Sequence, residues 1–389
     1  MHVFRQIWAV TIMNVESLPL RIGASLVTVI GVACAVAVLI SLLAVGAGIM
    51  KSVDKNDRPD LAIVLSSGAA AEYMGSFSRA DVAMIGAAPG VKKTPDGKLL
   101  VQPQATVIVE VIKKSDGGAA NVLFRGTGLL DRRMRPEIQI TAGRQYRAGL
   151  HEIVVGRAAS RNFRDLDLGN TVLLRGTPWK VVGIYEDKGG IDENAIASDA
   201  DTVLAAFGRT GYQSVSVQLV SPDAFNTFRD ALKRNPQLSV DVKLLAQYYR
   251  DQIKPLSALY DFVGYFVGTI MAIGAVFGAI TTMYAAVDSR ARDIATLRAI
   301  GFGSTAVVVS VFAEALLLAI PGAILGVLVA ALIFNERDVA IGNISFQLAV
   351  TPGLVVLAIV WAVLIGFLGG LAPSIRAARL PVATALRAT

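Results

Sequence analysis

The residues that could carry chemistry in this sequence are few and far apart. Of its 389 residues, two are histidine and one is cysteine: His2, His151 and Cys34. A zinc site normally needs three or four histidine, cysteine or carboxylate ligands at short, regular spacings. The sequence therefore gives no support for a zinc site. It also lacks a G-x-S-x-G motif and any serine, histidine and aspartate set that would indicate a hydrolase.

One acidic stretch could either bind calcium or form a solvated loop. Its carboxylates are Glu186, Asp187, Asp192, Glu193, Asp199 and Asp201. Calcium loops of the EF-hand type place oxygen ligands at alternate positions around a glycine, and this stretch lacks that spacing. The sequence therefore favours a solvated surface loop.

Nucleotide chemistry is not expected on this chain either. The motif G-x-x-x-x-G-K-[ST], which cradles phosphates in P-loop ATPases, does not occur in the sequence. We therefore expect no catalytic residue, no metal and no cofactor on this chain. If ATP drives its action, another polypeptide supplies the ATPase.

The most informative segment, residues 288–303, reads DSRARDIATLRAIGFG and lies between two long apolar runs. Helical spacing separates an apolar face from the charged positions. The apolar face holds Ile294, Leu297 and Ile300, and the charged positions are Arg290, Asp293 and Arg298. Such a helix can lie at a membrane surface, with its charges toward the cytoplasm. Alternatively, the segment is a solvated loop whose arginines only orient the flanking spans.

The elements that position this segment are membrane spans. Hydrophobic residues make up 54% of the sequence, charged residues make up 17%, and the mean hydropathy is +0.56. These values are too apolar for an ordinary soluble domain. Four runs reach the length of about 20 residues that a helix needs to cross a bilayer. They occupy residues 22–50, 258–287, 304–334 and 353–373, and a short loop at 335–352 joins the last two.

The N-terminal segment, residues 1–21, is expected to be amphipathic. Its apolar residues at helical spacing are Phe4, Ile7, Trp8, Ile12 and Val15. This pattern is typical of a helix in the membrane surface, or of the first turns of a tilted span. The apolar run that follows exceeds the roughly 7–15 residues of a secretory signal, so we expect it to be retained.

Arginines in the short segments predict the orientation of the spans. They cluster before the first span, between the second and third, and after the fourth, at Arg5, Arg21, Arg290, Arg292, Arg298, Arg376, Arg379 and Arg387. The loop between the third and fourth spans has only Arg337. By the positive-inside rule, both termini and residues 288–303 are cytoplasmic. The long segment 51–257 is then on the outside.

The segment 51–257 is long enough for one or two domains with their own cores. Runs of β-branched, aromatic or alternating residues predict strands at 61–65, 99–112, 122–126, 153–155, 171–174, 179–185 and 215–220. Helices are expected at 78–85, 157–163, 201–207 and 222–233. The predicted fold is thus a membrane protein of four helices with a large α+β extracytoplasmic domain between the first two. We expect two lobes that divide near Asp116–Gly118 and Asp131–Pro136.

The charge and cysteine content limit the partners of this outer segment. The net charge of +7 is modest, and the charges are scattered rather than gathered in a stripe. Such a distribution is typical of a solvated surface and does not indicate nucleic-acid binding. Since Cys34 lies in the first span, the outer segment contains no disulfide.

Two features inside the spans have alternative interpretations. Small-residue pairs at four-residue spacing, which let helices approach closely, occur at Gly264, Gly268, Gly274 and Gly278 in the second span, at Gly322 and Gly326, and at Gly366 and Gly370. They indicate close packing within one bundle, or a dimer contact. Glu314 is the sole ionisable residue well inside a span. It either pairs with an arginine of residues 288–303 or forms a local bond within the bundle.

Several motifs in this order resemble the FtsX/MacB superfamily of ABC transporter permeases. RDIATLRAIGF follows the second span and ARLPVATALR follows the fourth. The outer segment contains HEIVVGRAASRNF and LGNTVLLRGTPWKVVGIYEDKGG, which are similar to the periplasmic core domain of this superfamily. Because the chain begins directly with the membrane part, it is more similar to the stand-alone permeases of the DevC type than to members with a fused ATPase.

The resemblance implies a dimer, expected to be a homodimer, that rests on two copies of a separate ATPase subunit carrying ATP and Mg²⁺. A coupling helix would dock on each ATPase through Arg290, Arg292, Asp293, Leu297, Arg298 and Gly301. The tail, residues 374–389, would add a second contact. The first two spans, with the glycines of the second, would form the dimer contact among membrane lipids.

The resemblance also leaves three functions open for a protein of the bacterial inner membrane. The first is export or efflux, with a periplasmic adaptor of the membrane-fusion type and an outer-membrane channel. The second is extraction of lipoproteins, as in Lol-type members. The third is regulation of cell-wall hydrolases, as in FtsX. Motion of the outer domains, driven by the ATPase, would perform the work in each case.

Overall fold

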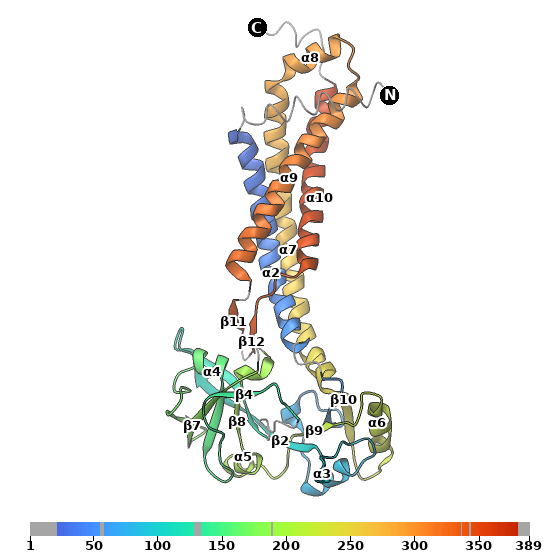
Figure 1. Cartoon of the computed structure of the whole chain (residues 1–389). Coiled ribbons are helices and arrows are strands. Elements are labelled where there is room, and N and C mark those ends of the chain that lie inside the picture. Colours follow the sequence, from blue (N-terminus) through green and yellow to red (C-terminus); the bar gives the residue numbers. More distant parts are fainter. Residues whose placement is uncertain are drawn as a thin grey trace. The chain divides into compact units, whose positions relative to one another are not determined.

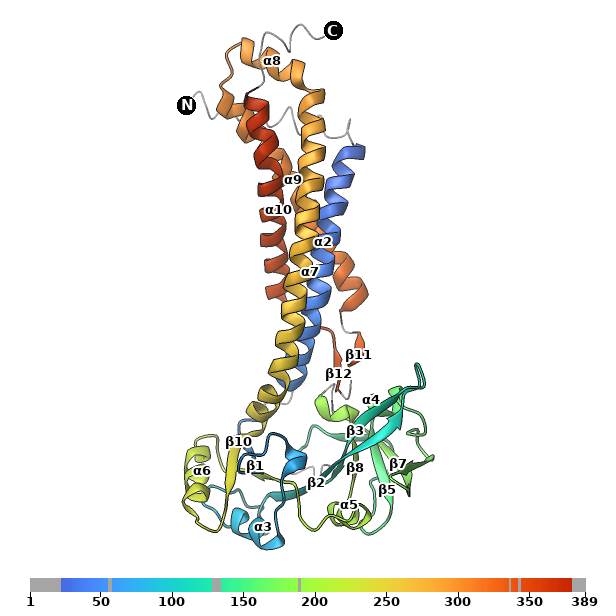
Figure 2. The same cartoon turned by 180° about the vertical axis from the view of Figure 1, so that it is seen from behind.

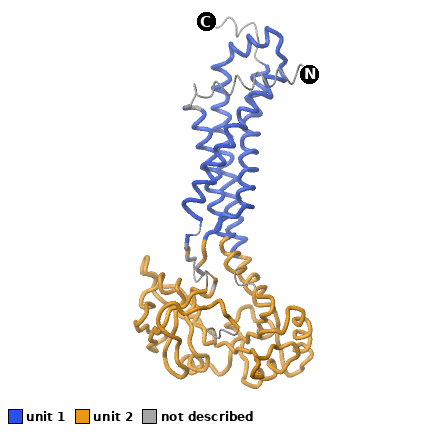
Figure 3. The backbone as a smooth tube through the Cα atoms, viewed as in Figure 1, with its two compact units in different colours: residues 1–47, 256–337, 348–389 blue, residues 48–255, 338–347 orange. Residues whose placement is uncertain are grey.

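The computed structural model of this chain describes residues 22–54, 58–127, 134–187, 190–335, 337–341 and 344–379. It divides into a helical unit, Met1–Ala47, Leu256–Arg337 and Leu348–Thr389, and a globular unit, Gly48–Pro255 and Asp338–Gln347 (Figure 3). The predicted amphipathic segment 1–21 and the end of the tail, 380–389, lie outside the described residues.

Four long helices account for the predicted membrane spans (Figure 1). They are α2 (Ile22–Asp54), α7 (Leu245–Ser289), α9 (Ser304–Phe334) and α10 (Pro352–Ala378). In the described part of the chain, each is long and apolar enough to cross a bilayer. A short helix, α8 (Ala291–Ala299), connects α7 to α9. The four-helix prediction is therefore confirmed.

Helix α7 begins thirteen residues before the predicted span, at Leu245 rather than at residue 258. Hydropathy missed these turns because they carry polar residues and include Pro255. They form a helix because one side of them is buried, at Leu245, Tyr248 and Ile253. Helix α2 likewise continues past residue 50, since Ser52 and Val53 are buried.

The loop between the third and fourth spans contains a hairpin that sequence analysis did not predict. Strands β11 (Asp338–Ile341) and β12 (Ile344–Gln347) pair antiparallel, and Phe346 is buried. Both strands belong to the globular unit. Each has apolar residues at alternate positions, but four residues are too few for periodicity to identify a strand on its own.

The globular unit is built on one ten-stranded mixed sheet (Figure 2). The order is β10-β1-β9-β2-β3-β8-β5-β7-β4, and β6 pairs with β7. The bounds are β1 Leu61–Ser66, β2 Val101–Ile112, β3 Ala119–Gly126, β4 Gln139–Gly143, β5 Glu152–Gly156, β6 Thr171–Leu174, β7 Thr177–Glu186, β8 Ile196–Ser198, β9 Ser214–Gln218 and β10 Val240–Leu244. The helices are α3 Arg79–Gly86, α4 Arg157–Asn162, α5 Ala200–Ala206 and α6 Ala224–Arg234, with short 3₁₀ helices η2 Glu72–Met74 and η3 Ile191–Asn194. The predicted α+β fold is confirmed.

Two hydrophobic cores lie along this sheet, and strand β2 connects them. One core surrounds Trp179 and Phe124, and the other surrounds Phe228. The first residues of β2 pair with β9, and the rest pair with β3. The predicted division at Asp116–Gly118 is wrong, because these residues form the tight turn between β2 and β3, where Gly117 has φ +70°. A turn of this kind attracts glycine and aspartate as strongly as a domain boundary does.

Candidate functional site

Helix α8, in the segment that sequence analysis singled out, has well-defined ends. Asp293 lies in its first turn and Arg298 in its last, where each charge favours the helix dipole. The helix ends at Gly301, whose φ of +105° is accessible to glycine without strain. The N–H groups of Gly301 and Phe302 donate to the carbonyls of Arg298 and Leu297, which completes a Schellman motif. This stop lets the chain turn into α9.

A buried ion pair ties the start of this segment to α9. Arg290 donates from Nη1 to Glu314 Oε2 at 3.0 Å and from Nη2 to Glu314 Oε1 at 2.6 Å. Their side chains are only 9% and 5% exposed. Glu314 therefore pairs with an arginine of residues 288–303, which was one of the two interpretations of its sequence position. A bidentate pair of this kind fixes orientation as well as distance.

Apolar packing attaches α8 to the other helices of the unit. Ile294 is buried in a cluster with Val287 of α7, Val307 and Val311 of α9, and Ala377 of α10. Because every long helix except α2 contributes to this cluster, a force on α8 would be felt by three helices at once.

A second, exposed ion pair joins α7 to α10 near this cluster. Arg376 lies 3.3 Å from Asp288, and its guanidinium lies 5.1 Å from the centre of the Tyr284 ring. Arg376 belongs to the part of the predicted tail contact that the structure describes, which ends at residue 379.

The sides of α8 differ from the sequence prediction at two residues. Arg290, assigned to the charged face, is buried against Glu314, whereas Ile300, assigned to the apolar face, is 73% exposed. Both lie outside the helical turns, since Arg290 caps the N-terminus and Ile300 caps the C-terminus. The free surface of the segment is formed by Arg292, Asp293 and Ile300, with Leu297 and Arg298 half-buried.

The glycines of the first predicted pair in α7 pack against α2. A Cβ added at Gly264 would lie 2.9 Å from Leu43 Cδ2, and one at Gly268 would lie 2.6 Å from Leu39 Cδ1. In α9, a Cβ at Gly326 would lie 2.6 Å from the carbonyl oxygen of Ala33 in α2. These glycines therefore serve packing within one bundle.

The second glycine pair of α7 is different. A Cβ added at Gly274 or Gly278 would meet no described atom within 4 Å. The same helix exposes a row of large apolar side chains at Phe262, Phe266, Ile270, Ile273 and Phe277. This face of α7 is thus open within the described part of the chain.

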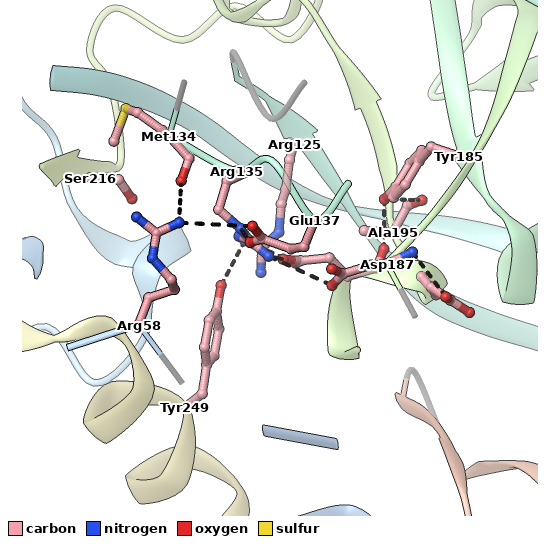
Figure 4. Close-up of polar contacts among 12 residues, drawn as sticks. Arg58, Arg125, Met134, Arg135, Glu137, Tyr185, Asp187, Ala195, Ser216 and Tyr249 are labelled. Carbon is pink, nitrogen blue, oxygen red and sulfur yellow. Dashed lines mark hydrogen bonds and ion pairs between the residues drawn. The ribbon is translucent and has the colours of Figure 1, made fainter. Parts of the chain in front are cut away.

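The globular unit contains a buried ionic network that sequence analysis missed (Figure 4). At one end, Arg125 of β3 donates to Glu72 Oε1 of η2 at 2.7 Å and to the hydroxyl of Tyr249 in α7 at 2.8 Å. The Arg125 guanidinium also lies 3.4 Å from Asp192 of η3. The side chains of Arg125, Glu72 and Asp192 are at most 4% exposed.

Arg135 extends this network. It lies 3.1 Å from Asp192 and 3.6 Å from Asp187, and it also pairs with Glu137 (Figure 4). Asp187 and Asp192 are fully or almost fully buried. The interpretation of this acidic stretch as a solvated loop is therefore wrong for these two residues, because arginines distant in sequence neutralise them.

Burial acts in opposite ways on the two carboxylates that contact Arg125. Burial raises the pKa of Glu72, and the attraction of Arg125 only partly offsets this effect. Burial also disfavours the charge of Asp192, but Arg125 and Arg135 outweigh it and hold the pKa of that carboxyl below its ordinary value. One carboxylate is thus well neutralised and the other is poorly satisfied.

Comparison with known proteins follows both parts of the chain. The family model of the MacB-like periplasmic core domain matches residues 25–235, and the FtsX-like permease C-terminal model matches residues 265–382. The chain is 23% identical over 243 residues to an uncharacterized ABC transporter permease of Methanocaldococcus jannaschii, covering 59% of this chain and 61% of that protein. It is also 23% identical over 385 residues to the macrolide export ATP-binding/permease protein MacB of Hahella chejuensis, covering 93% of this chain and 57% of that protein.

The chain spans about three fifths of the length of these relatives. Among solved structures, the periplasmic region of MacB from Actinobacillus actinomycetemcomitans is similar at 13% identity and a TM-score of 0.36. That match covers 50% of this chain and 92% of the solved one.

Proposed function

Since this chain belongs to the ABC transporter permeases with a MacB-like periplasmic core domain and an FtsX-like permease region, we propose that it couples a separate ATPase subunit to motion of its globular unit. ATP and Mg²⁺ would bind to that ATPase and not to this chain. Two copies of the ATPase would serve a dimer of the permease.

The observation that carries this proposal is the attachment of α8. The segment presents Arg292, Asp293 and Ile300 on its free surface, while Ile294 and the Arg290–Glu314 pair hold it to three long helices. A mixed charged and apolar surface on a rigid helix can give a partner both affinity and specificity. Rigid attachment then lets movement of the partner reach the helices.

The orientation follows from the arginines of the short segments. With the positive-inside rule, α8 and both termini face the cytoplasm, and the globular unit lies on the other side of the inner membrane. In this orientation α8 meets an ATPase in the compartment that contains ATP.

Export is the function that we favour for the complete transporter. A curated relative is named for macrolide export, and it covers most of this chain. In our proposal a periplasmic adaptor of the membrane-fusion type receives the globular unit and leads to an outer-membrane channel. Co-purification of a lipoprotein chaperone or a cell-wall hydrolase instead of an adaptor would replace export by one of the other two family functions.

Exposed substitutions on α8 test the coupling proposal. We expect Arg292→Glu with Ile300→Asp to release the ATPase from affinity-purified permease, lowering its recovery about tenfold or more, because like charges and a lost apolar contact weaken docking. The measurement is mass spectrometry of the eluate together with its ATPase activity. These positions are better than Leu297, which is half-buried and lines a small packing gap beside Glu314.

The control for this experiment is Arg164→Glu, an exposed charge reversal in the globular unit. It should leave ATPase recovery unchanged. Retention of the ATPase by the α8 double variant would contradict the assignment of α8 as the coupling helix.

We also propose that the open face of α7 is the homodimer contact. Gly274 and Gly278 would let the backbone of a second copy approach, and Phe266, Ile270 and Phe277 would pack beside them. This use agrees with the dimer that the family resemblance implies.

Two leucine substitutions separate packing from dimerisation. We expect Gly274→Leu to convert the dimer to a monomer with an unchanged melting temperature, because the new side chain meets open space within one chain. Gly326→Leu should lower the melting temperature, because its Cβ would approach the Ala33 carbonyl and overpacking typically costs about 1–3 kcal/mol. Native mass spectrometry in detergent measures the first effect and thermal unfolding the second. A Gly274→Leu protein that remains dimeric would rule out this contact.

A further inference from the structure

The globular unit contains a cavity of about 300 Å³ beside the buried ionic network. Its walls come from η2, β2, β3, η3 and the first turns of α7. The buried floor is formed by Glu72, Arg125 and Asp192, and half-buried residues such as Tyr73 and Leu123 form the rim. This volume is at the lower end of the range for small-molecule sites, about 300–1,000 Å³.

One carboxylate oxygen on the floor has no donor. Arg125 satisfies Glu72 Oε1, but Glu72 Oε2 is buried without a hydrogen-bond partner among the described residues. The Glu72 side chain is only 4% exposed. Buried carboxylate oxygens are normally satisfied, because an unmade hydrogen bond to a charged group is unfavourable. The cavity therefore lacks a hydrogen-bond donor at this position.

The charge around the cavity favours a cation. In the described residues, the connected network joins three arginines to five carboxylates: Arg58, Arg125 and Arg135 with Asp60, Glu72, Glu137, Asp187 and Asp192. The positive charge of Arg125 is already shared among Glu72, Asp192 and the Tyr249 hydroxyl. An added cation would balance the excess of carboxylates.

The remaining walls favour an organic cation over a metal ion. Ile108, Leu123 and Ile253 supply aliphatic surface, and Tyr73, Tyr248 and Tyr249 supply aromatic surface. Aromatic rings attract ammonium groups, and the aliphatic walls suit a short hydrocarbon body. Calcium needs six to eight oxygen ligands, whereas a single carboxylate oxygen is available at this position.

We propose that this cavity binds a small organic cation with a primary ammonium group, which donates a hydrogen bond to Glu72 Oε2. Its aliphatic body lies against Ile108, Leu123 and Ile253. This site is independent of the coupling helix and of the transported substrate. Because Tyr248 and Tyr249 of α7 line the cavity, an occupied site also stiffens the attachment of the first turns of α7 to η2 and β3.

The pH dependence of binding follows from the groups that face the ligand. These are Glu72 from η2, Arg125 from β3, Asp192 from η3, and Tyr248 and Tyr249 from α7. The pKa of Glu72 is raised, that of Asp192 is lowered, and those of both tyrosines are raised. Glu72 is thus the group that must lose its proton to accept an ammonium. Affinity should rise with pH through the raised pKa of Glu72, and binding should release protons.

The test uses the full chain in nanodiscs, titrated calorimetrically with n-butylammonium chloride, 1-butanol, tetramethylammonium chloride and magnesium chloride. We expect butylammonium to bind about tenfold or more tightly than 1-butanol, which lacks the charge, and than tetramethylammonium, which lacks an N–H donor. Equal binding of butylammonium and 1-butanol would overturn the proposal. Binding of magnesium alone would overturn it as well.

Variants locate the site. Glu72→Gln should abolish butylammonium binding, whereas the matched control Glu137→Gln, in the same network but outside the cavity lining, should leave it unchanged. If Glu72→Gln lowers the melting temperature, Leu123→Trp provides a second test, since it fills the cavity from the half-buried rim. Full affinity in Leu123→Trp, or in a folded Glu72→Gln protein, would show that the cavity is not the site.

Discussion

Replacing Arg125 by methionine is expected to lower the free energy of unfolding of the globular unit by about 3–5 kcal/mol, because the change leaves Glu72 and Asp192 buried with too little positive charge. Methionine keeps much of the volume of the side chain, so the loss reports charge rather than a cavity. Trp179, which is fully buried in this unit, provides a fluorescence signal. Phenylalanine at the other two tryptophans, Trp8 and Trp361, makes that signal specific.

The matched control for this prediction is Arg144→Met. Arg144 pairs with Glu152 in the same unit, at 2.6 Å, but its side chain is 45% exposed. Water and salt screen such a pair, so its loss should change the free energy of unfolding by no more than about 1 kcal/mol. Equal effects of the two substitutions would show that burial does not determine the strength of the Arg125 contacts.

The helices and strands could be predicted from the sequence because their signals are local. The spans stand out by hydropathy, and strands such as β3 and β7 stand out by β-branched and aromatic residues. The start of α7 could not be found in this way. Its polar first turns are helical because Tyr248 and Ile253 are buried among residues that are distant in sequence.

The ionic network could not be predicted, because its partners come from separate parts of the chain. Glu72, Arg125, Asp192 and Tyr249 meet only once the sheet and α7 are formed. One local signal was present. Arg125 follows the apolar residues VLF in a strand, and a charge at such a position is seldom buried without a partner.

The prediction for α8 located the segment but not the sides of its terminal residues. Helical periodicity assigns faces only within helical turns, whereas Arg290 and Ile300 occupy the two caps. The glycine pairs show a similar limit. Gly268 and Gly274 have the same sequence signature, yet one packs against Leu39 and the other meets open space.

The second large effect is expected from the Arg290–Glu314 pair. Arg290→Met or Glu314→Gln alone should destabilise the helical unit, because each leaves one charge buried without its partner. The double variant Arg290→Met/Glu314→Met removes both charges from an apolar surrounding that includes Ile294 and Val311. Replacing a buried ion pair by apolar residues of similar volume is often neutral or stabilising. The double variant should therefore recover the melting temperature.

This recovery separates stability from coupling. The double variant keeps Arg292, Asp293 and Ile300 on the free surface, so it should still bind the ATPase at the level of the unchanged protein. If the ion pair transmits movement from α8 to α9, the ATP-driven transport rate of this complex should fall about tenfold, which corresponds to about 1.4 kcal/mol of lost coupling. The measurement is transport into vesicles at equal ATPase occupancy. If the double variant instead restores both stability and transport, the pair only fixes α8 in place, and the apolar cluster around Ile294 is sufficient to transmit the movement of the ATPase.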